Sequence, residues 1–174
     1  MKKQWAIYIA VVVFAGCAST QRDVSTATAS ATLKPTAGNT ANGTVTFEQH
    51  RGKVRVSGEV SGLQPNSQHG FHVHEKGDCS APDASSAGGH FNPLKKEHGH
   101  VMPGGPHAGD MPNLRVDANG RATFSFDLSG MAVTEGETSI VGKSVVVHAK
   151  PDDYRTQPTG DSGARIACGV IAKR

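Results

Sequence analysis

Apolar and polar residues alternate with a period of two in several short runs, and this pattern constrains the fold more than any other. Val45 and Phe47 alternate with polar residues, and the series resumes at Val54 after a turn at residues 50–52. Successive side chains of a β-strand point to opposite faces, so the pattern predicts strands with one buried face. Gly58 lies within the second run and predicts a bulge or bend there.

A second hairpin is expected between Leu114 and Leu128, with its turn at residues 117–120. Three further strands are expected, at His69–Glu75, Ser144–Ala149 and Arg165–Ile171. Two long stretches fit no strand, namely Lys76–Asn113 and Lys150–Gly163, and loops of that length in a compact domain are usually functional. Short strands separated by Gly-rich turns indicate an all-β sandwich or barrel.

Composition excludes several other classes of protein. The 174 residues suit one domain, and 21 Gly and 9 Pro suit many turns. A hydrophobic share of 36% and a charged share of 19% argue against a multispanning membrane protein and against a highly charged disordered chain. The formal net charge of +3 is too small for a surface that tracks phosphates, so no nucleic acid partner is expected.

Residues 1–16 have the features of a signal peptide. Lys2 and Lys3 are followed by an uncharged apolar run, Trp5 to Phe14, which is too short to span a bilayer. The small residues before Cys17 resemble a bacterial lipobox, in which the cysteine is lipidated and becomes the new N-terminus. This predicts an exported protein of the bacterial cell envelope, lipid-anchored to a membrane that faces the periplasm or the exterior. An ordinary signal peptide cleaved nearby is the alternative, and it would leave Cys17 incidental.

Residues 17–41 are rich in Ser, Thr and Ala and have no periodicity, so they are expected to form a flexible tether. The folded domain is accordingly expected at residues 42–174. Outside the cytosol a disulfide can persist, and Cys79 and Cys168 can pair there if Cys17 carries lipid.

Nine histidines occur in the chain, and several have the spacing of metal ligands. His72 and His74 lie two apart in an expected strand, so both imidazoles point to one face. His148 ends another apolar strand and offers a third imidazole. Three or four neutral imidazoles on a rigid sheet suit Cu(II), which favours tetragonal nitrogen sites.

The first long loop adds further ligand types, namely His90, His98, His100, His107 and Asp110. Three histidines and one carboxylate would form a closed tetrahedral zinc site. His107 and Asp110 could both reach one ion around a tight turn. The pattern leaves open which histidines are ligands and whether one metal ion or two are bound.

Four segments together resemble copper/zinc superoxide dismutases of the bacterial secreted type. The segments are Gly70–Glu75, Gly89–Pro93, His107–Asp110 and Gly163–Ile171. They occur in the order of that family, and the similarity runs from about Asn42 to the end of the chain. The resemblance implies a Greek-key β-sandwich or flattened β-barrel of about eight antiparallel strands with two long functional loops. It also implies dismutation of superoxide to molecular oxygen and hydrogen peroxide.

The resemblance assigns a ligand set to each of two metals. Copper would be held by His72, His74, His90 and His148. Zinc would be held by His90, His98, His107 and Asp110, so that His90 bridges the two ions. Asp152 matches an aspartate that joins one histidine of each set, here His72 and His98, and fixes both rings.

Further residues match the family outside the ligand sets. Arg165 matches the arginine beside copper and is, with His90, the expected catalytic residue. Thr159 matches a threonine that narrows the substrate channel, and Cys79 and Cys168 match the intrachain disulfide. A lysine that precedes the threonine in many eukaryotic members is Pro158 here, so the source of long-range steering is open.

Two other functions would use part of the same residue set. A tethered copper-binding or copper-storing domain would need the histidines but neither Arg165 nor Asp152. A zinc-dependent hydrolase would need an open zinc position and a general base, whereas four candidate zinc ligands are present. Bacterial relatives occur as monomers and as dimers, so the sequence leaves a homodimer open.

Overall fold

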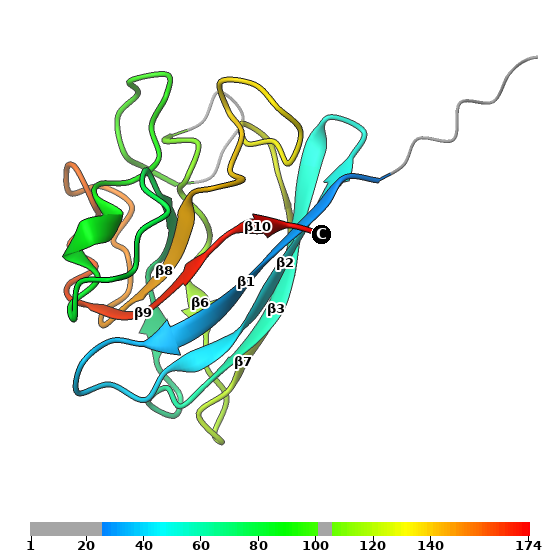
Figure 1. Cartoon of the computed structure of the whole chain (residues 1–174). Coiled ribbons are helices and arrows are strands. Elements are labelled where there is room, and N and C mark those ends of the chain that lie inside the picture. The colour runs from blue at the N-terminus through cyan, green and yellow to red at the C-terminus, as the bar shows by residue number, and fades with distance from the viewer. Residues whose placement is uncertain (1–25, 101–105) are drawn as a thin grey trace, which may run out of the picture.

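Antiparallel strands form the framework of the domain in the computed structural model, which describes residues 26–100 and 106–174 (Figure 1). The strands are β1 (Thr28–Pro35), β2 (Asn42–His50), β3 (Lys53–Ser61), β4 (Gln68–His69), β5 (Phe71–His74), β6 (Leu114–Arg115), β7 (Ala122–Leu128), β8 (Ser144–His148), β9 (Arg165–Val170) and β10 (Ala172–Lys173). A single 3-10 turn, η1 (Ser85–Ala87), is the helical element of these described ranges. Accordingly, no helix in this part of the chain is long and apolar enough to cross a membrane.

The strands form one curled sheet of eight, in the order β5-β8-β9-β1-β2-β3-β7, with β10 also paired to β1. Strands β4 and β6 pair separately. The neighbours β9 and β1, and likewise β3 and β7, are distant in sequence, which is the Greek-key arrangement of long return connections. The predicted all-β fold with about eight antiparallel strands is thus confirmed.

The core fills the concave side of the sheet with the apolar residues of the alternating runs. Val45, Phe47, Val54 and Val56 are all fully buried, as the period of two predicts. Burying one such side chain contributes about 1.5–3 kcal/mol, so these few positions fix which face of the β2–β3 hairpin points inward.

Two details of the predicted hairpins are wrong. The β2–β3 register is unbroken from His50↔Lys53 to Asn42↔Ser61, so Gly58 marks no bulge. Glycine is needed there because a Cβ would collide with the Thr44 carbonyl and lie 3.1 Å from the Phe124 ring. The second hairpin has its expected turn, but β6 pairs with β4 while β7 pairs with β3.

The predicted tether is wrong over residues 28–35, because β1 occupies them. Ala29, Ala31 and Leu33 are buried, and β1 pairs with β2, β9 and β10. Two of these three inward residues are alanines, so the alternation is weak and the Ser- and Thr-rich composition hides it. The domain therefore begins no later than Thr28.

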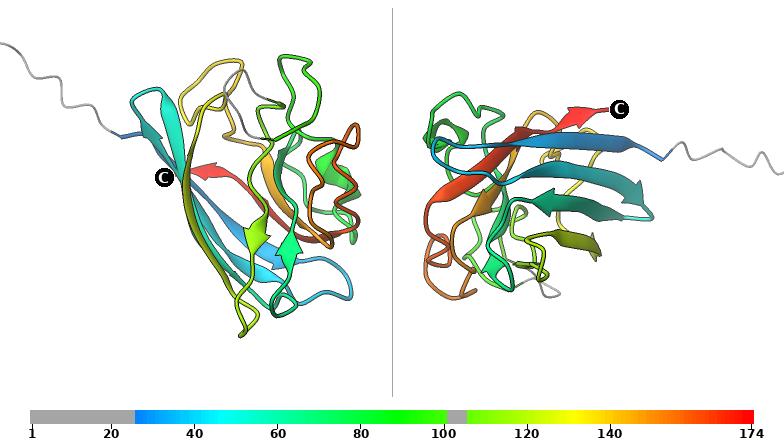
Figure 2. Two further views of the ribbon diagram at one scale, coloured as in Figure 1. Left: turned by 180° about the vertical axis from the view of Figure 1, so that it is seen from behind. Right: turned by 90° about the horizontal axis from the view of Figure 1, so that it is seen from below.

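Both predicted long loops are present, and they lie together at one end of the sheet. The loop that follows β5 and the loop that follows β8 stand side by side in the front and rear views (Figures 1 and 2). The start of β1 lies at the other end. This arrangement separates the end that carries the loops from the end where the N-terminal segment joins the domain.

Candidate metal centre

The loop after β5 returns along the free edge of that strand and brings its own side chains beside the strand histidines. Isolated bridges pair His74 with His90 and His72 with Asp110. Two backbone hydrogen bonds of Val73 hold the returning segment in place. The Val73 amide donates to the Gly109 carbonyl, and the Phe91 amide donates to the Val73 carbonyl, each at 2.8 Å. Gly109 is required there, because a Cβ would collide with the Val73 carbonyl.

The first group of side chains contains the four histidines that the resemblance implies for copper. One potential ligand atom of each lies within 4.8 Å of the others. The four residues are His72, His74, His90 and His148. All four are buried, and His148 comes from β8, which pairs directly with β5.

Two of these rings are oriented by backbone carbonyls. His74 donates from Nδ1 to the Gly88 carbonyl at 2.9 Å, and His148 donates from Nδ1 to the Gly163 carbonyl at 3.2 Å. These donations leave an electron pair on each Nε2, and the two Nε2 atoms are 3.3 Å apart. Two lone pairs facing each other in a buried site fit a shared cation.

The other two rings each present a buried nitrogen that has no hydrogen-bond partner. His72 uses Nε2 to contact the Asp152 carboxylate at 2.8 Å, and His90 uses Nδ1 to contact Asp110 at 2.8 Å. The remaining atoms, Nδ1 of His72 and Nε2 of His90, are buried and unpaired. Buried polar atoms are normally satisfied, so these two orphans fit a copper ion held by four imidazoles.

The second group gathers three histidines around one carboxylate. Its members are His90, His98, His107 and Asp110, with potential ligand atoms again within 4.8 Å of one another. The Nδ1 atoms of the histidines lie 2.8, 2.9 and 3.4 Å from Asp110 oxygens. Although they are buried and lie this near the carboxylate, the Nδ1 atoms of His98 and His107 make no hydrogen bond. Three nitrogens and one oxygen that converge in this way fit a closed, four-coordinate zinc site.

His90 belongs to both groups, with Nδ1 in the second and Nε2 in the first. The sequence profile of the copper/zinc superoxide dismutase family matches residues 41–171. The chain is a member of that family.

Named relatives and a solved structure agree with this assignment. Superoxide dismutase [Cu-Zn] 1 of Aquifex aeolicus is 44% identical over 122 residues, which are 68% of this chain and 72% of the relative. Superoxide dismutase [Cu-Zn] of Saccharomyces cerevisiae is 45% identical over 149 residues, 81% of this chain and 94% of the relative. The crystal structure of a SOD-like protein from Bacillus subtilis matches with a TM-score of 0.73 at 37% identity, covering 80% of this chain and 95% of that one.

Asp152 links the two groups of this dismutase-family site. Its carboxylate contacts Nε2 of His72 at 2.8 Å and Nε2 of His98 at 2.9 Å. A Cβ at position 160 would collide with this carboxylate, so only glycine allows the second long loop to pass this close to Asp152. The predicted bridging contacts of Asp152 are thus present in the structure.

Sequence reasoning missed two residues that hold Asp152. The Asn113 side chain pairs with its backbone twice, donating to the Asp152 carbonyl and accepting from the Asp152 amide, both at 2.9 Å. The Tyr154 amide donates to the Asp152 carboxylate at 2.7 Å, and the Tyr154 hydroxyl accepts from the Asn113 amide at 2.8 Å. A single sequence contains no signal for this network, because its members are joined only in space.

Sequence reasoning also missed contacts of two further side chains. Gln157 holds the backbone of His98, accepting from its amide and donating to its carbonyl, both at 2.9 Å. His69 is buried and contacts the His148 carbonyl through Nδ1 at 2.7 Å. It therefore braces the backbone of a strand histidine.

Burial and neighbouring charges lower the pKa of some ligand histidines and raise the pKa of another. Burial, followed by nearby histidines, holds the pKa of His74 and of His148 well below the ordinary value. Burial likewise lowers the pKa of His90 to about 4. Burial also lowers the pKa of His98, but the carboxylates of Asp110 and Asp152 outweigh it and raise that pKa to about 9. Without metal, His74, His90 and His148 are therefore neutral at pH 7, whereas His98 is protonated.

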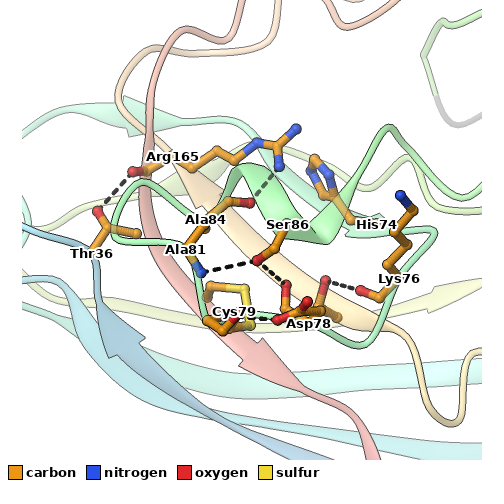
Figure 3. Close-up of a disulfide and its surroundings, with 12 residues drawn as sticks. Thr36, His74, Lys76, Asp78, Cys79, Ala81, Ala84, Ser86 and Arg165 are labelled. Carbon is orange, nitrogen blue, oxygen red and sulfur yellow. Dashed lines mark hydrogen bonds between the residues drawn. A yellow bond between two sulfur atoms is a disulfide. The ribbon is translucent and has the colours of Figure 1, made fainter.

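Arg165 lies next to the first group. It pairs with His148 in the β8–β9 ladder, and its positive charge is one of the causes that lower the pKa of His74 and of His148. The guanidinium donates to the Ala84 carbonyl at 2.6 Å (Figure 3). It also donates to the Gly88 carbonyl at 2.5 Å. Because Gly88 also accepts from His74, one carbonyl fixes both the arginine and a strand histidine.

A disulfide fixes the loop that supplies these carbonyls. Cys79 and Cys168 are bonded across 89 positions, which confirms the predicted disulfide (Figure 3). Under it, Ala84, Ala87 and Val146 form a small buried cluster with Cys168. The first long loop is therefore pinned to β9, from which Arg165 also projects.

Thr159 lies in the second long loop, where its carbonyl accepts from the Ser162 hydroxyl at 2.9 Å. Its expected narrowing of a substrate channel stays a prediction. Cys17 and the expected signal peptide lie outside the described residues.

Proposed function

We propose that the chain catalyses the dismutation of superoxide, in which two superoxide anions and two protons give one oxygen and one hydrogen peroxide. The observation that carries the proposal is the sharing of His90 by two buried ligand groups, beside a charged Arg165. His72, His74, His90 and His148 would hold copper, and His90, His98, His107 and Asp110 would hold zinc. Copper supplies the redox chemistry by cycling between Cu(II) and Cu(I), whereas zinc has none.

The chain's own residues bind the anion and handle a proton. Arg165 carries a permanent charge and is held by two carbonyls, so it can fix a small anion beside the first group. Nε2 of His90 is the atom that would hold a proton between the two half-reactions, while Nδ1 stays in the second group.

The same residues argue against the other candidate functions. Asp110 completes four ligands in the second group, which leaves no open zinc position for a hydrolase. A copper-storage domain has no need of a guanidinium fixed beside the ligands, nor of an aspartate that contacts both groups. These two features favour the enzyme.

The test measures bound metals and superoxide consumption on the same samples. Chain loaded with copper and zinc should consume superoxide under pulse radiolysis, and chain loaded with zinc alone should not. A chain that binds both metals and consumes superoxide no faster than the zinc-loaded sample would be a binding module.

We further propose that the chain is exported and lipid-anchored through Cys17 in a bacterial cell envelope. The small residues before Cys17 support the anchor, and the Cys79–Cys168 disulfide supports an oxidising compartment. Mass spectrometry and membrane fractionation of the full chain and of Cys17→Ser test this. Unchanged mass and unchanged membrane association in the variant would contradict it.

A further inference from the structure

The end of the barrel where β1 begins collects exposed cations from two parts of the chain. Arg51 lies in the β2–β3 turn and Lys53 begins β3, and this turn is tied to the same end because the Gln49 amide donates to the Ala27 carbonyl. Lys173 pairs with Ala29 in the β10–β1 ladder, and Arg174 donates from its amide to the Thr28 carbonyl. Figure 1 shows the β2–β3 turn and β10 on either side of the start of β1.

With Arg55 counted, five cationic side chains lie at this end against four acidic ones, which leaves one positive charge in excess. Asp127 is engaged by Arg55 through two hydrogen bonds of 2.8 and 3.1 Å. Glu48 lies opposite Arg55 and Thr28 in the sheet. Glu135 and Glu137 follow in the loop whose Val133 amide bonds the Gln49 side chain. Within residues 26–100 and 106–174, none of the four cations Arg51, Lys53, Lys173 and Arg174 forms an ion pair.

The proposed lipid would hold this end close to a membrane. Cys17 precedes Thr28 by eleven positions. A chain of that length reaches at most about 40 Å. Without β1 the expected tether would be more than twice as long. The membrane surface is therefore within easy reach of the β2–β3 turn.

The ligand groups lie at the opposite end of β1. The Thr36 hydroxyl donates to the Arg165 carbonyl at 2.8 Å, just beyond Pro35, where β1 ends. Eight strand residues span about 26 Å, so Arg165 and its neighbour His148 are roughly that far from Thr28.

We propose that this cationic end, comprising Arg51, Lys53, Lys173 and Arg174, binds anionic phospholipid head groups and points the metal centre away from the bilayer. The inference rests on the lipid anchor proposed above. Attraction between these charges and a lipid surface extends over about 8 Å at physiological salt, which the short tether keeps within range. Superoxide would then reach Arg165 from the aqueous side.

Lysine acetylation on vesicles tests the orientation. The lipidated, metal-loaded protein is bound to vesicles of phosphatidylcholine alone or of phosphatidylcholine with phosphatidylglycerol, and acetylation rates are read by mass spectrometry. Lys53 and Lys173 should react several-fold more slowly on the anionic vesicles, and high salt should remove the difference. Lys34, exposed near the other end of β1, is the internal control and should react alike on both.

Charge reversal supplies the matched variants. Arg51→Glu combined with Lys53→Glu should abolish the protection of Lys173, whereas Lys34→Glu should leave it intact. The anchor is judged separately by the mass of the same samples. Absence of lipid overturns both the anchor and this surface. A lipidated protein in which Lys53 and Lys173 react equally on both vesicles overturns the surface alone.

Discussion

The two ligand groups share one histidine and differ in what holds the others. The first group stands mainly on strands, with His72 and His74 on β5 and His148 on β8. The second group comes entirely from the loop after β5 and depends on Asp152 and Gln157, which lie in the other long loop. The difference teaches that one metal site is formed by the barrel itself, whereas the other is assembled by contacts between loops.

Electrostatics follows the same division. The strand histidines His74 and His148 are neutral because burial disfavours their charged forms, so they are ready to bind a metal. His98 lies between two carboxylates that favour its protonated form. Metal binding to the second group must therefore displace a proton as well as order a loop.

Removing a strand ligand should separate the two sites most sharply. His148→Ala should abolish copper binding and superoxide consumption while zinc stays bound, because His148 belongs only to the first group. Metal analysis with pulse radiolysis measures this, and His50→Ala, at an exposed histidine, is the control. Equal loss of both metals would contradict the independence of the sites.

Opening the disulfide should harm the loop more than the strands. A closed loop of this length contributes about 2–5 kcal/mol to the free energy of unfolding, so Cys79→Ser should lower that free energy by a similar amount. Zinc affinity should fall more than copper affinity. Denaturant unfolding and chelator competition check both, with Cys79→Ser/Cys168→Ser excluding an effect of the free thiol. Unchanged stability would contradict the role of the bond.

Reversing the charge beside the strand group should affect the rate without removing metal. Arg165→Glu should lower the rate of superoxide consumption about 10-fold to 1,000-fold and invert its dependence on salt. Arg165→Lys should fall between, because it keeps the charge and loses the planar fork. Pulse radiolysis across ionic strength measures this. A glutamate variant with the original rate and salt slope would shift the steering role to other cations.

Loosening Asp152 tests how far the loop group depends on its supports. Asn113→Ala should weaken zinc binding about 10-fold to 100-fold, since it frees the backbone of the residue that orients His98. Copper should weaken less, because β5 positions His72 independently. Chelator competition gives both affinities, and Asn39→Ala, at an exposed asparagine, is the control. A larger loss of copper than of zinc would reverse the comparison.

Changes of pH should also separate the two groups, with a smaller effect on metal affinity than the substitutions above. The pKa of His98 is about 9 without metal, so a proton competes with zinc below that pH and apparent zinc affinity should fall about tenfold per pH unit. The lowered pKa values of His74, His90 and His148 remove proton competition at these three ligands, so copper affinity should depend less on pH than zinc affinity. Titration calorimetry in buffers of different ionisation enthalpy measures the protons released. Equal release by both metals would contradict the assignment.

The features that the sequence predicted best are those that recur with the two-residue period of a β-strand. Val45, Phe47 and the pair His72 and His74 follow the period of two, so burial and ligand direction could both be deduced from spacing. β1 escaped because small alanines make up most of its inward face. Two of its strand partners, β9 and β10, lie far away in sequence, and only the folded chain shows that they pair with it.

The loop residues could be assigned only in part. Their ligand roles came from the resemblance, because spacing alone left open which of the loop histidines converge. The groups that hold Asp152 and Arg165 in place had no such guide. Asn113 acts through backbone groups of Asp152, and Arg165 donates to the carbonyls of Ala84 and Gly88, which any residue could provide. Interactions with main-chain atoms leave no trace in residue identity.

The double contact of Asp152 has a consequence for how the metals are acquired. A carboxylate that orients His72 with one oxygen and His98 with the other makes each site sensitive to occupancy of its neighbour. Thermodynamic linkage makes that influence reciprocal, so zinc must alter the affinity for copper by the same factor as copper alters the affinity for zinc. The protein would therefore respond to the joint supply of the two ions, and scarcity of one would change how firmly the other is retained.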